Sequence, residues 1–275
     1  MSAAIDLATR QKTLSGMGSR MRPKRFNWSW GRPVAQARIG DGGVSVAFKG
    51  REVSEPLTST GGTLAESQLE AGRLLVELAK RVGAGSVALA VSDRWLRPTC
   101  LRLGPSYLTD AEIARIVIAH YGAAFGDNMA AWDIRWRVHS DGAVVAVACP
   151  PTLARLGAAL ASQGVALVSI VARSIDLLDR TLQDNGPAWL VHLDCSCLTA
   201  IRTDGSKWIA WHVSLLDDVS AEAACGAFQR IVQVAEPGGC RLVRLVWARS
   251  LAAGAEALSR RLSEFGWSVV IRMVE

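Results

Sequence analysis

Residues 188–213 read AWLVHLDCSCLTAIRTDGSKWIAWHV, three short apolar runs divided by polar turns. The runs 188–193, 198–202 and 208–213 are rich in Val, Ile, Leu and Trp, and β-branched and aromatic residues favour strands. Residues 203–206 (Thr-Asp-Gly-Ser) have the composition of a tight turn, because Gly takes the positive φ that such turns need. The stretch predicts three consecutive strands, of which the last two form a hairpin.

Helix and strand patterns alternate beyond this stretch. The predicted order is helix 220–235, strand 242–247, helix 250–265 and strand 267–273. Apolar residues at helical spacing indicate the helices, and short apolar runs between polar segments indicate the strands. Three strands followed by helix, strand, helix and strand predict a mixed sheet flanked by helices.

The N-terminal part of the chain repeats this order. Residues 41–43 (Asp-Gly-Gly) and 141–142 (Asp-Gly) are hairpin signals between strand-like runs. Thr109 and Glu112 have the spacing of a capping box that starts a helix. The predicted elements are strands 34–39, 44–49, 86–91, 96–103, 132–139, 143–149 and 165–172, and helices 63–82, 151–162, 174–182 and one that begins at 109. The sequence therefore predicts two similar units, each with strands paired by hairpins followed by alternating helices and strands.

Basic residues are concentrated at the N-terminus. Residues 1–33 contain seven of the 31 Lys and Arg residues and one of the 25 Asp and Glu residues, so the rest of the chain carries 24 of each. The net charge of +6 thus belongs to a local segment and not to a folded surface. We expect three parts: a basic arm at 1–33, flexible or bound to a partner, a first lobe with an inserted subdomain at 34–185, and a second lobe at 186–275.

The composition, 50% hydrophobic and 20% charged, is that of a folded protein and excludes collagen, coiled coil and wholesale disorder. The N-terminal residues lack the apolar run of a signal peptide. The longest uncharged stretch, 156–172, has 17 residues and is interrupted at 162–164, short of the roughly 20 apolar residues of a membrane span. The six cysteines lie mostly in apolar runs, which favours a reducing compartment such as the cytoplasm.

Four stretches add a family pattern to this repeated order. They are SDRWLR at 92–97, WDIRW at 132–136, the helix and strand pair 151–172, and the hairpin 189–211 with its tryptophans. Together they resemble the PilM and GspL families, the cytoplasmic actin-like assembly proteins of type IV pili and type II secretion. The resemblance covers about 34–275. It implies an α/β fold of duplicated actin-like (ribonuclease H-like) units, with mixed sheets flanked by helices.

Actin-like ATPases hold phosphates on two hairpins with Gly turns, since only Gly lets the backbone approach a phosphate closely. By this resemblance the first hairpin falls on 38–45, where Arg38 replaces the family's metal-side Asp and Ser45 replaces its Lys. The second falls on 194–196 (Asp-Cys-Ser), which keeps the carboxylate but puts a side chain at the turn. The vestigial phosphate positions are Gly40, Asp41, Asp194 and Ser196.

The loop that would hold adenosine departs from the family pattern as well. With Gly254 aligned to the family's Gly in the following helix, Trp247 and Ala248 stand where the family has Gly-Gly. A bulky Trp removes the room in which adenosine would stack. The loss of the metal-side carboxylate removes the negative charge that would compensate Mg²⁺. We therefore expect no catalytic residue, no cofactor and no metal, with ATP and Mg²⁺ disfavoured.

The second hairpin also offers candidate ligands for a zinc site. His192, Cys195, Cys197 and His212 are residue types that bind zinc, but the Cys-x₂-Cys spacing of closed sites is missing. Buried, small, apolar cysteines are the favoured interpretation. Asp194 is likewise explained by a carboxylate that closes a strand turn, and no Gly-x-Ser-x-Gly nucleophile elbow occurs.

The arm has a chemistry of its own. Residues 20–30 read RMRPKRFNWSW, a mixture of cations and aromatics that can pair with acidic groups and pack on a partner. Two interpretations stay open: a segment that grips an acidic neighbour or the anionic inner leaflet, and a solvated basic tail whose aromatics dock on its own domain. The partner-binding candidates are Arg20, Arg22, Lys24, Arg25, Phe26, Trp28 and Trp30.

The resemblance implies a non-catalytic actin-like scaffold of a pilus or type II secretion inner-membrane platform. Such a protein is cytoplasmic and peripheral to the bacterial inner membrane, and it binds a cytoplasmic segment of a single-pass assembly protein and other platform components. A homodimer stays open. One alternative is an actin-like ATPase or kinase-type enzyme that uses Asp41 and Asp194 as metal-side and catalytic carboxylates. A nucleic-acid binder acting through the arm is the other, and no recognised nucleic-acid module supports it.

Overall fold

The computed structural model describes the chain from Pro33 to Val274, with gaps. The described residues are 33–58, 63–103, 108–126, 129, 131–138, 142–181, 186–194, 196–204, 207–218, 220–235, 240–248 and 252–274. All seven partner-binding candidates of the arm, from Arg20 to Trp30, lie outside them.

The first sheet has five strands in the order β3-β2-β1-β4-β8. Its strands are β1 (Ala35–Gly40), β2 (Gly43–Phe48), β3 (Arg51–Glu55), β4 (Ser86–Val91) and β8 (Ala166–Ala172). The first three pair antiparallel, whereas β4 and β8 extend the sheet in parallel. Helices α1 (Leu64–Arg81), α4 (Pro151–Ala154) and α5 (Leu156–Ala161) pack on it, and Leu75 and Leu78 of α1 are fully buried.

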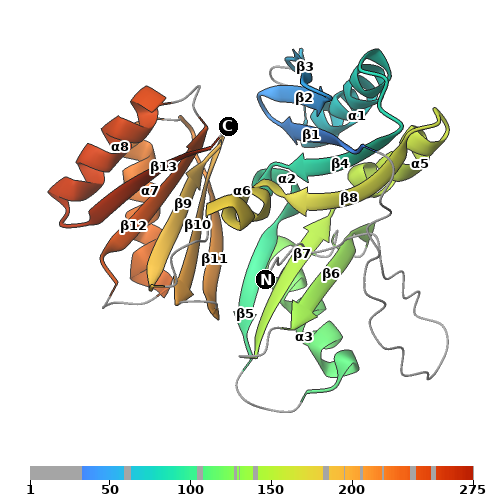
Figure 1. The fold of residues 1–275 in the computed structure, drawn as a ribbon. Coiled ribbons are helices and arrows are strands. Elements are labelled where there is room, and N and C mark those ends of the chain that lie inside the picture. The colour runs from blue at the N-terminus through green and yellow to red at the C-terminus, as the bar shows by residue number, and fades with distance from the viewer. Residues whose placement is uncertain are drawn as a thin grey trace.

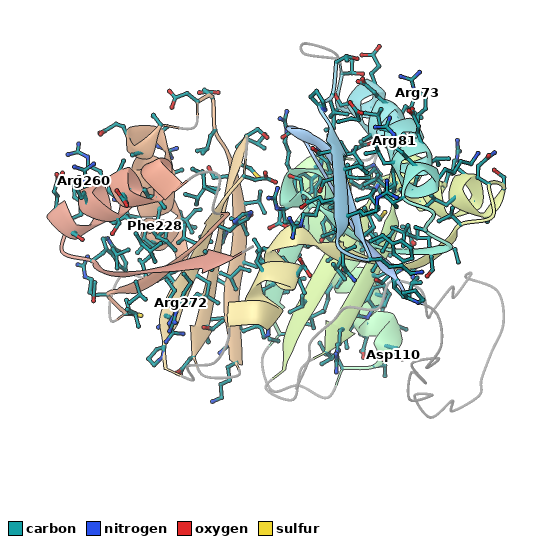
Figure 2. The ribbon with its side chains drawn as sticks, turned by 45° about the horizontal axis from the view of Figure 1, so that its top comes forward. Arg73, Arg81, Asp110, Phe228, Arg260 and Arg272 are labelled. Carbon is teal, nitrogen blue, oxygen red and sulfur yellow. The ribbon has the colours of Figure 1, made fainter. Side chains whose placement is uncertain are left out.

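The second sheet repeats this topology in the order β11-β10-β9-β12-β13. Its strands are β9 (Ala188–Leu193), β10 (Cys197–Asp204), β11 (Lys207–Leu215), β12 (Leu242–Ala248) and β13 (Ser268–Val274). The antiparallel trio is again extended by two parallel strands. Helices α7 (Ala221–Ala235) and α8 (Ala252–Glu264) cover one face (Figure 1). Phe228, which is labelled in Figure 2, packs between Trp189 and Trp267.

A small sheet is inserted between β4 and β8 of the first unit. It has the order β5-β7-β6 and one covering helix. Its elements are β5 (Pro98–Arg102), α3 (Asp110–Phe125), β6 (Asp133–Val138) and β7 (Ala143–Cys149). The small sheet packs against β11, where the Arg102 guanidinium donates to the Trp208 carbonyl at 3.1 Å. The two halves of the chain are thus also joined through this insertion (Figure 1).

Two short helices lie between the two large sheets in Figure 1: α2 (Asp93–Leu96), which follows β4, and α6 (Arg173–Thr181), which follows β8. The apolar core of the first sheet continues through this region. It reaches four residues of the second sheet, Leu190, Ile201, Trp208 and Trp211. The predicted fold class, an α/β fold of two similar units with mixed sheets and flanking helices, is confirmed.

Two local predictions were wrong, and one strand was not predicted. The expected strand 96–103 starts two residues later, because α2 ends with Arg97 in the left-handed region (φ 43°) before β5 begins. The expected helix 151–162 is divided into α4 and α5 at Arg155. Strand β3 was not predicted, because its sequence REVSE is polar and it lies at the exposed edge of the sheet.

The predicted capping box at the start of α3 is confirmed. The Glu112 amide donates to the Thr109 hydroxyl oxygen at 3.3 Å, and the Thr109 amide donates to the Glu112 carboxylate at 2.7 Å. The hydrogen bonds that the Thr109 amide and hydroxyl donate to the Glu112 carboxylate lower the pKa of Glu112. Thr63 and Glu66 form the same box at the start of α1.

Within the described ranges, no helix has both the length and the apolar composition to cross a membrane. Five cysteines lie in the described ranges, and all five are free thiols: Cys100, Cys149, Cys197, Cys225 and Cys240.

Candidate functional site at the junction of the two hairpins

The four vestigial phosphate positions come together where the β1–β2 and β9–β10 hairpins meet. The first hairpin closes with Gly40 opposite Gly43, and the second closes with the Asp194 amide donating to the Cys197 carbonyl at 2.9 Å. A Cβ atom added to Gly40 would lie 3.6 Å from an Asp194 carboxylate oxygen. The two turns therefore pack directly on each other.

The Asp41 carboxylate has donors on both sides of this junction. The Trp95 indole N–H donates to Oδ1 at 2.8 Å, and a guanidinium nitrogen of Arg94 lies 3.2 Å from Oδ2. The hydroxyl of Ser196, from the second half of the chain, also donates to Oδ2. Asp41 thus binds two side chains of α2 and one of the opposite hairpin.

Asp194 is paired with a cation as well. A guanidinium nitrogen of Arg173, the first residue of α6, lies 2.9 Å from Asp194 Oδ1. The Asp194 side chain is only 5% exposed, so this pair lies in a region of low dielectric. Both carboxylates that the enzyme alternative needs are therefore ion-paired with arginines of the chain itself.

A third carboxylate, that of Asp93, is fully buried behind these two. It accepts hydrogen bonds from the Thr199 hydroxyl at 2.7 Å and from the Ser174 backbone amide at 3.3 Å. Burial raises the pKa of Asp93 to about 6, an effect that the two hydrogen bonds oppose and the nearby Asp194 charge reinforces. Asp93 therefore joins α2 to α6 and to β10 of the second half.

Sequence reasoning did not identify Asp93, Arg94, Trp95, Arg173 and Thr199 as site residues. One signal was present: charged residues follow two apolar strands, Asp93 and Arg94 shortly after β4 and Arg173 directly after β8. Parallel strands have their carboxyl ends at the same edge of a sheet, which is where α/β proteins place their sites. These side chains thus share the edge at which β1 ends in Gly40 and Asp41.

The positions assigned to a lost metal-side carboxylate and a lost lysine lie deeper in the first hairpin. Arg38 and Ser45 are opposite each other in the antiparallel pair of β1 and β2. The turn itself requires Gly43, because its φ is +134° and a Cβ atom there would lie 2.4 Å from the Glu55 carbonyl oxygen. This glycine lets β3 pack against the hairpin, which is a structural role.

The residues aligned with the adenosine loop belong to a strand. Strand β12 continues through Trp247 and Ala248, which pair with Met273 and Val274 of β13. Gly254 lies in α8 and is exposed. The two residues aligned with the family's Gly-Gly loop are therefore the last two residues of strand β12.

The residues weighed for zinc do not converge. His192 lies opposite Thr199 and His212 opposite Ala200, and successive residues of a strand point to opposite faces, so the two rings are on different faces of the sheet. The His192 Nδ1–H donates to the Val246 carbonyl at 3.1 Å, and burial lowers the pKa of His192 to about 4. Cys195 lies outside the described residues, among which no group of three His, Cys, Asp or Glu side chains is placed to hold a metal.

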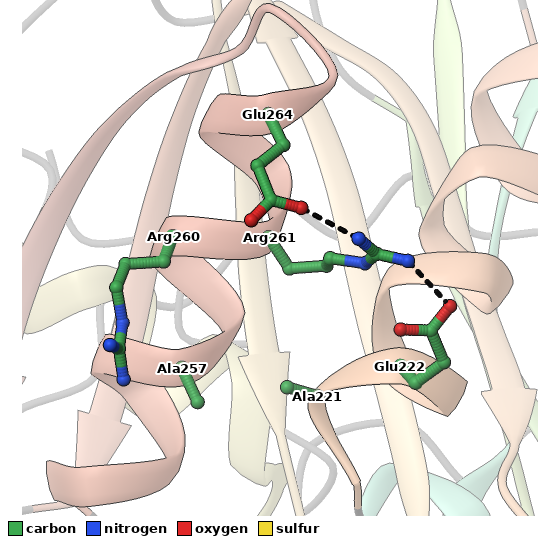
Figure 3. A pocket seen from close by; sticks show the side chains of 6 residues that line it. All are labelled: Ala221, Glu222, Ala257, Arg260, Arg261 and Glu264. Atoms are coloured by element: carbon green, nitrogen blue, oxygen red, sulfur yellow. Dashed lines mark hydrogen bonds and ion pairs between the residues drawn. The ribbon is translucent and has the colours of Figure 1, made fainter.

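A groove of about 220 Å³ lies on the outer face of the second half, between α7 and α8 (Figure 3). Arg261 extends across it and pairs with Glu222 at 2.9 Å and with Glu264 at 2.6 Å. Both carboxylates that Figure 3 shows in the groove are thus bound by one guanidinium. The arrangement is an exposed salt-bridge network between two helices, worth little in stability.

No family model matches the chain, and no curated protein matches it. Solved structures do match. The protein of the PilM-PilN type IV pilus biogenesis complex has a TM-score of 0.61 at 14% identity, over 87% of this chain and 88% of that one. A Bacteroides thetaiotaomicron protein with an actin-like ATPase fold and unknown function has a TM-score of 0.56 at 12% identity, over 88% and 91%. The cytoplasmic domain of EpsL, an inner-membrane component of the Vibrio cholerae type II secretion system, has a TM-score of 0.50 at 9% identity, over 78% and 82%.

These matches show that the chain has the actin-like fold. The predicted resemblance to the pilus and secretion assembly proteins is confirmed at the level of structure. At identities of 9% to 14% the shared feature is the fold, so function has to be argued from the residues of this chain.

Proposed function

We propose that this protein is a non-catalytic, actin-like scaffold of a pilus or type II secretion assembly platform, located in the cytoplasm at the bacterial inner membrane. It binds a cytoplasmic segment of a single-pass membrane partner and contacts other platform components. The observation that carries the proposal is the direct packing of the two hairpins, with Gly40 against Asp194. The structural likeness to PilM, which was solved in complex with PilN, supports the choice of partner class.

The electrostatics of the junction support the non-catalytic part of the proposal. A metal-dependent phosphoryl-transfer site needs carboxylates that are open to Mg²⁺ and its waters. Here Asp41 is bound by Arg94 and Asp194 by Arg173. An Mg²⁺ ion would have to displace a guanidinium from either carboxylate.

The enzyme alternative rests on one observation, the proximity of Asp41 and Asp194 at the hairpin junction. A kinase-type or ATPase mechanism through these two residues requires the hairpins to separate and both arginine pairs to break. Binding of Mg-ATP would reveal such an opening as a rise in the melting temperature.

We expect cross-linking in cells to join the full-length chain to a single-pass inner-membrane assembly protein. Mass spectrometry of the cross-linked product, recovered from the membrane fraction, identifies the partner. Recovery of the chain from the soluble fraction alone, with no cross-link to a membrane protein, would contradict the scaffold role.

A variant with alanine at Arg20, Arg22, Lys24 and Arg25 separates the two interpretations of the arm. Each cation near an anionic leaflet contributes about 1 kcal/mol, so a membrane-binding arm predicts at least a roughly tenfold loss from the membrane fraction. A matched variant with alanine at Arg73, an exposed cation of α1 in Figure 2, should keep the distribution of the wild type. An unchanged distribution of the arm variant would favour docking of the arm on its own domain.

A further inference from the structure

The Asp41 carboxylate is surrounded by three different kinds of donor. Arg94 supplies a guanidinium, Trp95 an indole N–H and Ser196 a hydroxyl, and all three are directed at one anionic group. The Trp95 side chain is fully buried, so its N–H needs an acceptor inside the protein. Without Asp41 this donor would stay buried and unpaired.

The same three donors would suit an oxyanion from solution. Phosphate and carboxylate present equivalent oxygens to hydrogen-bond donors, and Arg pairs with both. The site is also within reach of solvent, because the side chains of Arg94 and Asp41 are 36% and 20% exposed. The donor set thus has the charge, the chemistry and the access of a small anion site.

The position of Asp41 makes it a link between the two halves of the chain. It projects from the β1–β2 turn, and the Ser196 hydroxyl that it binds lies beside the β9–β10 turn of the second half. The hydrogen bond between Asp93 and Thr199 crosses the same junction a few residues away. The halves are therefore joined by two carboxylates, one partly exposed and one buried.

We propose that the Arg94, Trp95 and Ser196 side chains form an oxyanion site that the chain fills with its own Asp41 carboxylate, and that this contact holds the two halves together without any ligand. Removal of the carboxylate opens the site to inorganic phosphate. The inference does not require the scaffold role, because it concerns the closure of the fold and not the choice of partner. Its failure would leave the cross-linking result untouched.

The test compares the melting temperatures of the wild type, Asp41→Ala and Asp41→Asn in phosphate and in chloride at equal ionic strength and pH. Asp41→Ala is expected to melt lower in chloride. Phosphate at ten times its Kd should then raise the melting temperature of Asp41→Ala by about 3–5 °C. The wild type should show no such rise, because its own carboxylate occupies the donors.

Asp41→Asn is included in case Asp41→Ala does not fold. It keeps the size of the side chain and an acceptor for the Trp95 N–H, but it loses the charge. Phosphate should raise the melting temperature of Asp41→Asn less than that of Asp41→Ala. Asp133→Ala removes a carboxylate that pairs with Arg135 at 2.7 Å, far from the hairpins in sequence, and serves as the matched control. Its melting temperature should not respond to phosphate.

The double variant Asp41→Ala/Ser196→Ala should lose part of the phosphate effect, because one of the three donors is gone. An equal phosphate effect in the wild type, the Asp133→Ala control and Asp41→Ala would overturn the proposal. So would a set of Asp41 variants that melt like the wild type and do not respond to phosphate. A phosphate response confined to the Asp41 variants would support it.

Discussion

Replacement of Trp95 by alanine is expected to lower the free energy of unfolding by about 3–5 kcal/mol, the usual cost of emptying a buried Trp site. Trp95 is among the largest fully buried side chains of the chain, and it packs in the core of the first sheet. Its loss also leaves Asp41 without the indole donor at 2.8 Å. Urea unfolding followed by circular dichroism measures the change.

Two further variants separate packing from hydrogen bonding. Trp95→Phe keeps most of the apolar volume but removes the indole N–H. Its free energy of unfolding should therefore fall less than that of Trp95→Ala. Trp136→Ala is the matched control, because Trp136 is only partly buried on the edge strand β6, and it should also lose less. A loss below about 1 kcal/mol for Trp95→Ala would mean that Trp95 does not support the junction.

The contribution of Asp93 to stability is expected to grow as the pH falls. Its pKa is about 6 in the folded chain against 3.8 as the ordinary value, so the folded state binds this proton more readily than the unfolded state. The contribution is therefore complete below pH 3.8 and is lost as the pH rises through 6. A difference of about two pKa units corresponds to about 3 kcal/mol between the two limits.

This effect is measured as the difference in the free energy of unfolding between the wild type and Asp93→Asn, across pH 4 to 7. The difference should shift by about 2 kcal/mol in favour of the wild type from pH 7 to pH 4, because the rest of the effect develops only below pH 3.8. Other groups change with pH in both proteins and cancel in the difference. The neutral, buried His192, whose lowered pKa opposes folding in acid, is one of them. A difference that does not vary with pH would contradict the buried, high-pKa carboxylate.

The repeated fold could be predicted because its elements have strong local signals. Alternating apolar runs mark the strands, and the capping box at Thr109 and Glu112 fixes the start of α3. The exceptions have physical reasons. Strand β3 is polar because it lies at an edge, and α2 is a single helical turn whose Leu96 has the pattern of the first residue of a strand.

The candidate site was predictable only in part. The four hairpin positions followed from the resemblance, because glycine turns can be aligned by sequence. Their binding partners could not be predicted, since the Asp41 contacts to Arg94 and Trp95 join residues more than 50 positions apart, and the Ser196 contact spans 155. Side chains that meet only through the folding of two units leave no periodic pattern in either one.

The melting temperature of the purified protein with and without Mg-ATP tests the central claim, a scaffold whose hairpin junction is closed by its own side chains. Because Asp41, Asp194 and the two arginines occupy this junction, we expect no shift at millimolar Mg-ATP relative to Mg²⁺ alone. A ligand at 100 times its Kd would add about 2.7 kcal/mol, a rise of roughly 5–10 °C for a chain of this size. A rise of that size with Mg-ATP would contradict the account and favour an actin-like ATPase.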